Sequence, residues 1–214
     1  GYYTTGADNT YVGYAAGKGA SGAETDNVAV GKEALTSIST GTRNIAIGYD
    51  AAKALTSANR NLAIGYEALY SQNGTTEAMG NTAVGYLSGY YNVTGINNTY
   101  VGYGTGGSGA GGTNSHSNNT AIGYKALEGI TTGGSNIAIG RDAMINATTA
   151  AECVAIGYEA LGDIHTGSGA NVAIGYYAMR NVDEGTGGGD ADYNIAIGYD
   201  ALKGGDFGSN DRQL

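Results

Sequence analysis

One nine-residue motif occurs eleven times along this chain of 214 residues. It reads Asn, an apolar residue or Thr, a small residue, a β-branched residue, Gly, Tyr, any residue, Ala, and then Leu or Met. Neighbouring motif glycines lie 17 to 23 residues apart, and a period near 20 residues is typical of a solenoid. The eleven glycines are Gly13, Gly31, Gly48, Gly65, Gly85, Gly102, Gly123, Gly140, Gly157, Gly175 and Gly198.

The residues before each glycine predict a short strand. The position directly before the glycine is Val or Ile in all eleven copies, and the position two before it is Ala in nine and Tyr in two. The position three before it is Val, Ile or Leu in seven copies and Thr in four, so larger and small residues alternate. The glycine is expected where the coil turns sharply, with a positive φ or with neighbouring backbone too close for a Cβ.

These features together predict an all-β fold, a parallel β-solenoid or β-roll of about eleven coils forming one domain over 1–214, with repeats at 9–202. The Ala-Leu pair after the glycine predicts a second short strand or a bend on the other side of the coil. Asn starts the motif in ten copies and Cys153 replaces it in the ninth, so stacked Asn side chains are expected to bond to each other and to the turn backbone.

Composition excludes several classes of protein. Forty residues are Gly and none is Pro, without the three-residue period of collagen. The net charge is −9 and basic residues do not cluster, which argues against nucleic-acid binding. No apolar run approaches the roughly 20 residues of a membrane-spanning helix. One cysteine excludes an internal disulfide framework, and a start inside a repeat suggests a segment of a longer chain.

Subunit association is expected because one coil buries only four or five modest side chains. Since side chains alternate along a strand, the Ala column is expected to point away from the core of the coil and into a trimer interface. Tyr replaces this Ala twice, each time with Gly in place of the Leu: Tyr11 with Gly17 and Tyr100 with Gly106. Such an exchange of volumes predicts one shared, packed space between subunits. The expected interface residues are Tyr11, Ala46, Ala63, Tyr100, Ala138 and Ala173.

The pattern Asn-x-Ala-Ile-Gly-x-x-Ala resembles the head repeats of trimeric autotransporter adhesins, a left-handed parallel β-roll. The longer unit, "NTAVGY-x-AL" with a Ser/Thr/Gly/Asn link, is similar to repeats of bacteriophage tail fibres. The resemblance implies a non-catalytic, homotrimeric shaft, borne on a virion or outside the cell, that carries a surface for a host receptor such as a glycan. Two alternatives stay open: the head of a bacterial surface adhesin, and a monomeric ice- or glycan-binding solenoid.

Receptor contacts are expected in the long links after Gly65, Gly102 and Gly175, because binding in solenoids concentrates in such insertions. The candidate residues are Tyr70, Asn73, Thr105, His116, Asp183, Glu184, Asp190 and Asp192. Asp190 and Asp192 also form a candidate calcium turn, and no other cofactor is expected. His116 and His165 are each expected to be exposed in a link.

Two further patterns bear on chemistry. Gly102, Gly104 and Gly107 have the spacing of a nucleotide-binding loop, but no helix is predicted after them. Neither a Ser-His-Asp set nor a paired His motif is present, so an enzyme is not expected. The residue two after the glycine is acidic in six copies, which predicts a wet outer edge where stacked carboxylates repel: Glu33, Asp50, Glu67, Asp142, Glu159 and Asp200.

Tyr follows the glycine in nine of the eleven copies, and Lys32 and Arg141 interrupt this column. Two interpretations are open. The rings either stack on the faces of sugars, or pack against one another and shield the turn.

Overall fold

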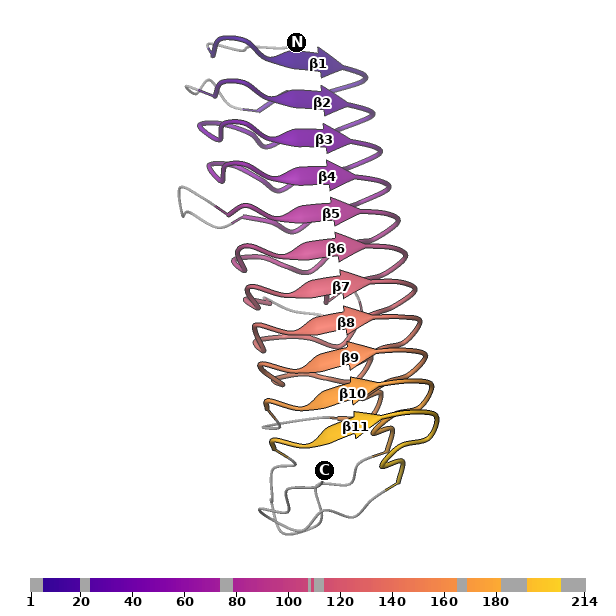
Figure 1. Cartoon of the computed structure of the whole chain (residues 1–214). Coiled ribbons are helices and arrows are strands. Elements are labelled where there is room, and N and C mark those ends of the chain that lie inside the picture. Colours follow the sequence, from indigo (N-terminus) through magenta and orange to yellow (C-terminus); the bar gives the residue numbers. More distant parts are fainter. Residues whose placement is uncertain are drawn as a thin grey trace.

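Each motif forms one short strand, and the eleven strands stack in parallel as a single sheet along the molecule (Figure 1). The computed structural model describes residues 6–19, 24–73, 79–107, 109, 114–164, 169–181 and 192–204. The strands are β1 Thr10–Val12, β2 Val28–Val30, β3 Ile45–Ile47, β4 Leu62–Ile64, β5 Thr82–Val84, β6 Thr99–Val101, β7 Thr120–Ile122, β8 Ile137–Ile139, β9 Val154–Ile156, β10 Val172–Ile174 and β11 Ile195–Ile197. Each strand pairs with the next one in sequence, so the predicted all-β parallel solenoid is confirmed.

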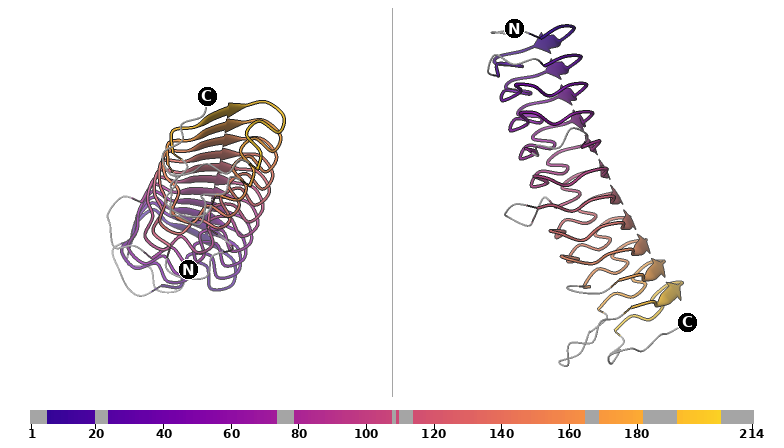
Figure 2. Two further views of the ribbon diagram at one scale, coloured as in Figure 1. Left: turned by 90° about the horizontal axis from the view of Figure 1, so that it is seen from below. Right: turned by 90° about the vertical axis from the view of Figure 1, so that its left-hand side faces the viewer.

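The register keeps every motif directly over the next. Ala46 lies opposite Ala63, and Ala63 lies opposite Ala83, although the link between the last two is three residues longer. Seen from the side, the strands form one face of the rod and the turns form the other (Figure 2). Extra residues in the links therefore change neither the pairing nor the order of the columns.

The motif glycines satisfy both expectations. Their φ angles lie between 129° and 140°, a region that L side chains rarely adopt. A Cβ on Gly48 would also collide with the carbonyl oxygen of Gly65 in the next coil, and this collision recurs at every motif glycine from Gly13 to Gly175. Only glycine fits this position, because both the φ angle and the backbone of the next coil exclude a side chain.

The Ala-Leu segment forms a turn and not a second strand. Leu35 and Leu69 have φ near +50°, and Glu33 and Glu67, two residues earlier, have φ of +58° and +51°. Left-handed residues at alternate positions prevent an extended conformation. Hydrogen bonds between coils persist here, because the Leu35 N–H donates to the carbonyl of Ala51 at 3.1 Å. Stacking thus satisfies the backbone on both sides of the rod.

The Ala column lies inside the coil, which corrects the predicted trimer interface. Ala46, Ala63, Ala138, Ala173 and Tyr100 have no exposed surface within one chain. Tyr11, in the first coil, is partly buried against the same core. The coil is so narrow that the central strand residue faces the Ala and Leu of the opposite turn, and a methyl group usually fills that gap. None of the six residues has its expected place between subunits.

The paired exchange of Tyr and Gly is real, but it occurs within one chain. A Cβ at Gly106 would collide with the ring of Tyr100, and a Cβ at Gly17 would collide with the ring of Tyr11. Gly89 belongs to the same arrangement, because its Cβ would lie 3.0 Å from Cδ2 of Tyr100 in the next coil. Two coils therefore give up a large side chain to make room for the ring of Tyr100.

The predicted asparagine ladder is confirmed and lies where each strand begins. The side-chain amide of Asn44 donates to Oδ1 of Asn27 at 3.1 Å and to the carbonyl of Ala58 at 2.9 Å. Its own Oδ1 accepts the backbone N–H of Asn61 at 3.0 Å. In the ninth coil the Cys153 N–H donates to Oδ1 of Asn136, and burial raises the pKa of the Cys153 thiol to about 11.

The part of the chain that the structure describes contains no helix of sufficient length and apolarity to cross a membrane.

Candidate binding surface

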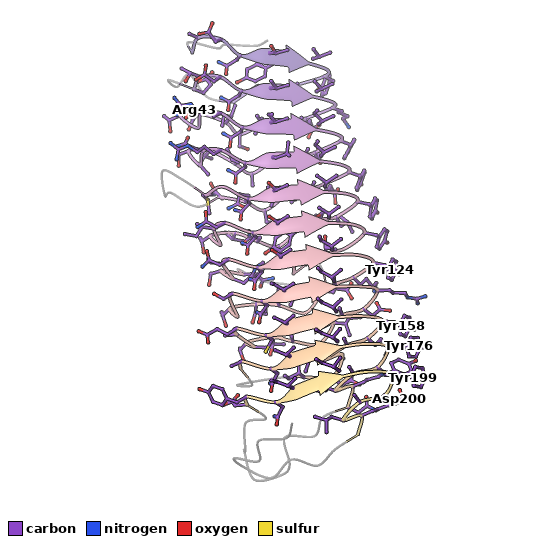
Figure 3. The ribbon with its side chains drawn as sticks, in the orientation of Figure 1. Arg43, Tyr124, Tyr158, Tyr176, Tyr199 and Asp200 are labelled. Atoms are coloured by element: carbon purple, nitrogen blue, oxygen red, sulfur yellow. The ribbon has the colours of Figure 1, made fainter. Side chains whose placement is uncertain are left out.

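A column of tyrosine rings runs along the edge of the rod at the carboxyl ends of the strands. Figure 3 shows Tyr124, Tyr158, Tyr176 and Tyr199 in line on this edge, with Arg43 on the opposite edge. We call the following residues the tyrosine ladder: Tyr49, Tyr66, Tyr86, Tyr103, Tyr124, Tyr158, Tyr176 and Tyr199. Stacked neighbours have centroids 4.9–5.3 Å apart and interplanar angles of 7–13°. One ring per coil repeats at the spacing of the strands.

Cations occupy the positions where a ring is missing. Lys32 Nζ lies 4.9 Å from the centroid of Tyr49. Cζ of Arg141 lies 5.4 Å from the centroid of Tyr124 and 5.5 Å from that of Tyr158. A guanidinium group between two rings is attracted to both faces, so Arg141 joins the two stacks without a ring of its own.

This packing decides between the two interpretations of the column. The inner rings, such as Tyr66 and Tyr86, are covered on both faces by neighbouring rings and are 41% and 43% exposed. Their edges and hydroxyl groups face the solvent. The inner rings therefore pack against one another, and their faces are not open to the ring of a sugar.

The acidic residues beside the ladder lie next to cations, so simple repulsion between stacked carboxylates was the wrong expectation for several of them. Lys53 Nζ lies 2.6 Å from Glu33 and 2.9 Å from Asp50, and its hydrogen bonds with both raise the pKa of Lys53 above its usual range. Arg180 Nε lies 2.6 Å from Glu159, and Arg141 Nε lies 3.0 Å from Asp142. The predicted wet edge is wrong for Asp50 and Asp142, which are buried, and the other four acidic residues are partly buried. Lys53–Glu33 and Arg180–Glu159 are pairs between neighbouring coils, and Lys53–Asp50 and Arg141–Asp142 lie within one coil.

A groove of about 390 Å³ opens where Arg141 interrupts the ladder. It is lined by Tyr124, Lys125, Arg141, Asp142, Ile145, Asn146, Glu159, Asp163 and Arg180. Its polar groups bond mainly to one another, since Asn146 Nδ2 donates to Asp163 at 2.8 Å and Arg180 is paired with Glu159. The groove is a polar surface depression whose charges are already matched.

Of the predicted receptor residues, Tyr70 and Asn73 lie at the surface. Tyr70 is partly exposed and stacks on Tyr90 with centroids 5.0 Å apart. Asn73 is exposed and accepts a hydrogen bond from the Thr56 hydroxyl at 2.8 Å. Both are therefore accessible, although they also take part in contacts between coils.

Thr105 and His116 are not receptor contacts, because both are fully buried. Thr105 Oγ1 lies 2.9 Å from the Ser88 hydroxyl, and Nδ1 of His116 lies 2.7 Å from the Tyr100 hydroxyl. Burial lowers the pKa of His116 to about 4 and raises that of Tyr100 well above its usual value. The expectation of an exposed histidine was wrong for His116, since its imidazole lies inside the coil and completes the pocket around Tyr100.

The same pocket explains the apparent nucleotide-binding glycines. A Cβ at Gly107 would lie 2.7 Å from Nε2 of His116, and one at Gly106 would collide with Tyr100. Gly104 has φ +60° within the turn. These glycines make room for an aromatic ring and an imidazole, so their spacing reflects packing and not phosphate binding.

The candidate calcium turn lies mostly outside the described residues, as do Asp183, Glu184, Asp190 and His165. Asp192 is described, and its Oδ1 accepts the backbone N–H of Gly169 at 2.6 Å. Within the described ranges, no group of three or more His, Cys, Asp or Glu side chains is arranged to hold a metal ion.

The sequence predicted that the Ala column faces outwards, but the two columns beside it form the outward side of the sheet. The side chains on either side of each central strand residue point outwards, and Ile45, Ile47, Val101, Ile122 and Ile137 are each 36–40% exposed. We call these two columns the outer sheet face: residues 10, 28, 45, 62, 82, 99, 120, 137, 154, 172 and 195, with residues 12, 30, 47, 64, 84, 101, 122, 139, 156, 174 and 197. None of them is charged, and only four, all Thr, are polar.

No protein-family profile matches the chain, and no curated protein matches its sequence significantly.

Proposed function

We propose that this chain is a structural, adhesive segment of a homotrimeric fibre of the phage tail-fibre kind, which serves in host attachment without catalysis. The observation that carries the proposal is the outer sheet face, an apolar strip as long as the rod that the described part of the chain leaves partly or fully exposed. Monomeric proteins rarely expose a continuous apolar strip of this extent, and such strips mark interfaces.

A second and third copy of the same chain are the occupants that fit this strip. Its two columns repeat with every coil, so a parallel copy meets apolar residues at each level along the whole rod. Three identical strips around one axis cover each other and close the assembly, whereas an unrelated partner would need the same periodicity. The resemblance to trimeric adhesin heads also supports a trimer. On the same resemblance we propose that the coil is left-handed.

The trimer accounts for the mechanism as well as the stability. A rod of eleven repeats at about 4.8 Å each is roughly 50 Å long, and three such rods make a stiff shaft. The links project from the shaft, and we propose that they hold the receptor contacts, with a cell-surface glycan as receptor. The protein would then act on a virion fibre or at the cell surface through geometry alone.

Sedimentation equilibrium of the protein tests the proposal directly. We expect the mass of three chains for the parent and the mass of one folded chain for the double variant Ile47→Lys, Ile137→Lys, because charges cannot be buried on the axis. Asn73→Lys, on an exposed turn, is the matched control and should leave the trimer intact. A parent mass of one chain would contradict the fibre and favour a monomeric ice- or glycan-binding solenoid.

A further inference from the structure

We propose that the tyrosine ladder is a site of oxidative modification, at which a one-electron oxidant of the haem peroxidase class joins the phenols of neighbouring coils as dityrosine. This proposal is independent of the fibre function, because every ring pair that it uses lies within one chain. The resulting bonds would staple one coil to the next.

The geometry holds the reacting rings together. Tyr86 has its centroid 5.0 Å from those of both Tyr66 and Tyr103, with interplanar angles of 11° and 9°. The backbones below these rings are in contact, since a Cβ on Gly65 would collide with Gly85. Two phenols held in this way react as one unit, with an effective concentration far above that of free tyrosine. Turning the two side chains then brings their ortho carbons into contact.

The ladder is also accessible to an oxidant. Tyr49, Tyr66, Tyr86, Tyr103 and Tyr124 are 39–45% exposed. Stacking covers both faces of the three middle rings, so their exposure falls on ring edges and hydroxyl groups. These edges carry the ortho carbons at which phenoxyl radicals couple. Buried Tyr100, in contrast, has no exposed surface and should not react.

The chemistry balances with hydrogen peroxide as the terminal oxidant. Each of two phenols loses one electron and its hydroxyl proton and becomes a phenoxyl radical. The radicals form one carbon–carbon bond between their ortho positions, and the two ortho hydrogens then return to the oxygens as the phenols re-form. The two electrons and two protons convert one molecule of hydrogen peroxide into two of water, so the protein loses two hydrogen atoms for each bond.

Carboxylates beside the ladder provide acceptors for the phenolic proton. Hydrogen bonding to Glu67 raises the pKa of Tyr66, and hydrogen bonding to Glu159 raises that of Tyr158. A phenol that is hydrogen-bonded to a base can lose its proton as the electron leaves, and this avoids the high-energy phenol cation.

The breaks in the column make the pattern of cross-links specific. Arg141 separates Tyr124 from Tyr158, and Lys32 separates Tyr14 from Tyr49, so these pairs lie two coils apart. At about 4.8 Å per coil such rings cannot be joined by one bond without displacing the intervening residue. Tyr14 is therefore an internal control, because it is 75% exposed but has no ring in the adjacent coil of its column.

Peptide mapping after treatment with horseradish peroxidase and hydrogen peroxide tests the proposal. The band that runs as one chain on a denaturing gel is digested with trypsin, which cleaves between the rings of interest. We expect peptide 44–53 linked to 61–125 through Tyr49 and Tyr66, and peptide 142–180 linked to 181–203 through Tyr176 and Tyr199. Each linked pair should have lost two hydrogens and show the blue fluorescence of dityrosine.

Two variants make the test sharp. Tyr66→Phe keeps the ring in the stack but should abolish the link from 44–53 to 61–125, while the link from 142–180 to 181–203 stays unchanged. Arg141→Tyr fills the gap and should create a link between 61–125 and the new peptide 126–180, which the parent lacks. Oxidised tyrosines without these linked peptides, or links through Tyr14, located by fragment spectra, as abundant as those through Tyr49, would overturn the proposal.

Discussion

At the scale of the residue, one buried ring shows how the coil balances its volume. Tyr100 takes the core position that Ala has in most coils, and its ring fits because positions 89 and 106 are Gly and carry no side chain. The Tyr100 hydroxyl finds its partner in His116, so the polar end of the ring is not left without a hydrogen bond. The exchange works because two neighbouring coils contribute to one pocket.

Tyr100→Ala should therefore lower the free energy of unfolding by about 3–5 kcal/mol, because it leaves a cavity and removes the partner of His116. The double variant Tyr100→Ala, Gly106→Leu has the Ala and Leu of an ordinary coil. It should recover part of this loss, because the Leu side chain fills the same space. Thermal unfolding of the parent, the single variant and the double variant measures both effects. A double variant no more stable than Tyr100→Ala would show that the two sites do not share volume.

His116 should make stability depend on pH below neutrality. Its pKa is about 4 in the folded chain and near 6.5 when unfolded, so only the unfolded chain takes up a proton between these values. The contribution is complete above about pH 6.5 and is lost as the pH falls towards 4, by about 3 kcal/mol in total. Denaturant titrations across this range measure it. His116→Ala should flatten the profile of stability against pH. Alanine occupies the equivalent position in other coils, as Ala58 and Ala150.

At the scale of the element, each coil depends on its asparagine. Asn44 connects three coils, since its side chain bonds to Asn27, Ala58 and the backbone of Asn61. Such a ladder satisfies buried polar groups that the short strands leave without partners. The three-residue strands alone would offer little pairing, so the side-chain ladder extends the sheet at its start.

Asn44→Ala should accordingly cost about 1–3 kcal/mol for each polar group left buried without a partner. Asn73→Ala is the control, because that exposed side chain has one bond to Thr56 and should change stability by less than about 0.5 kcal/mol. Urea unfolding of the two variants gives the comparison. Equal effects at both positions would argue that the ladder adds nothing beyond a surface contact.

At the scale of the whole molecule, stacking makes each link independent of the rod. The register between β4 and β5 is unbroken although their link is three residues longer than the shortest. A solenoid whose repeats touch only their neighbours tolerates insertions in this way. The links, where we propose the binding residues, can therefore vary while the stack of strands remains constant.

Deleting Thr186–Gly189 from the longest link should leave the melting temperature nearly unchanged, since the remaining spacing of 19 residues still exceeds the minimum of 17. These four residues lie outside the described ranges. The same deletion should alter adhesion to host cells if the link holds receptor contacts. Loss of the proposed trimer in sedimentation would instead show that the link supports the assembly.

The sequence by itself determined the period, the strands, the turn at each glycine and the asparagine ladder, because each of these follows from a local preference repeated eleven times. Only the tertiary structure decided which side of the strand faces inwards. Alternation defines two faces without ranking them, and the narrow coil admits Ala46 while Ile45 and Ile47 remain outside. The burial of His116 was also a tertiary matter, since its imidazole lies beside Gly107 and bonds to Tyr100. Thr105 takes the motif position of Ala51 and Ala68 and is buried as they are.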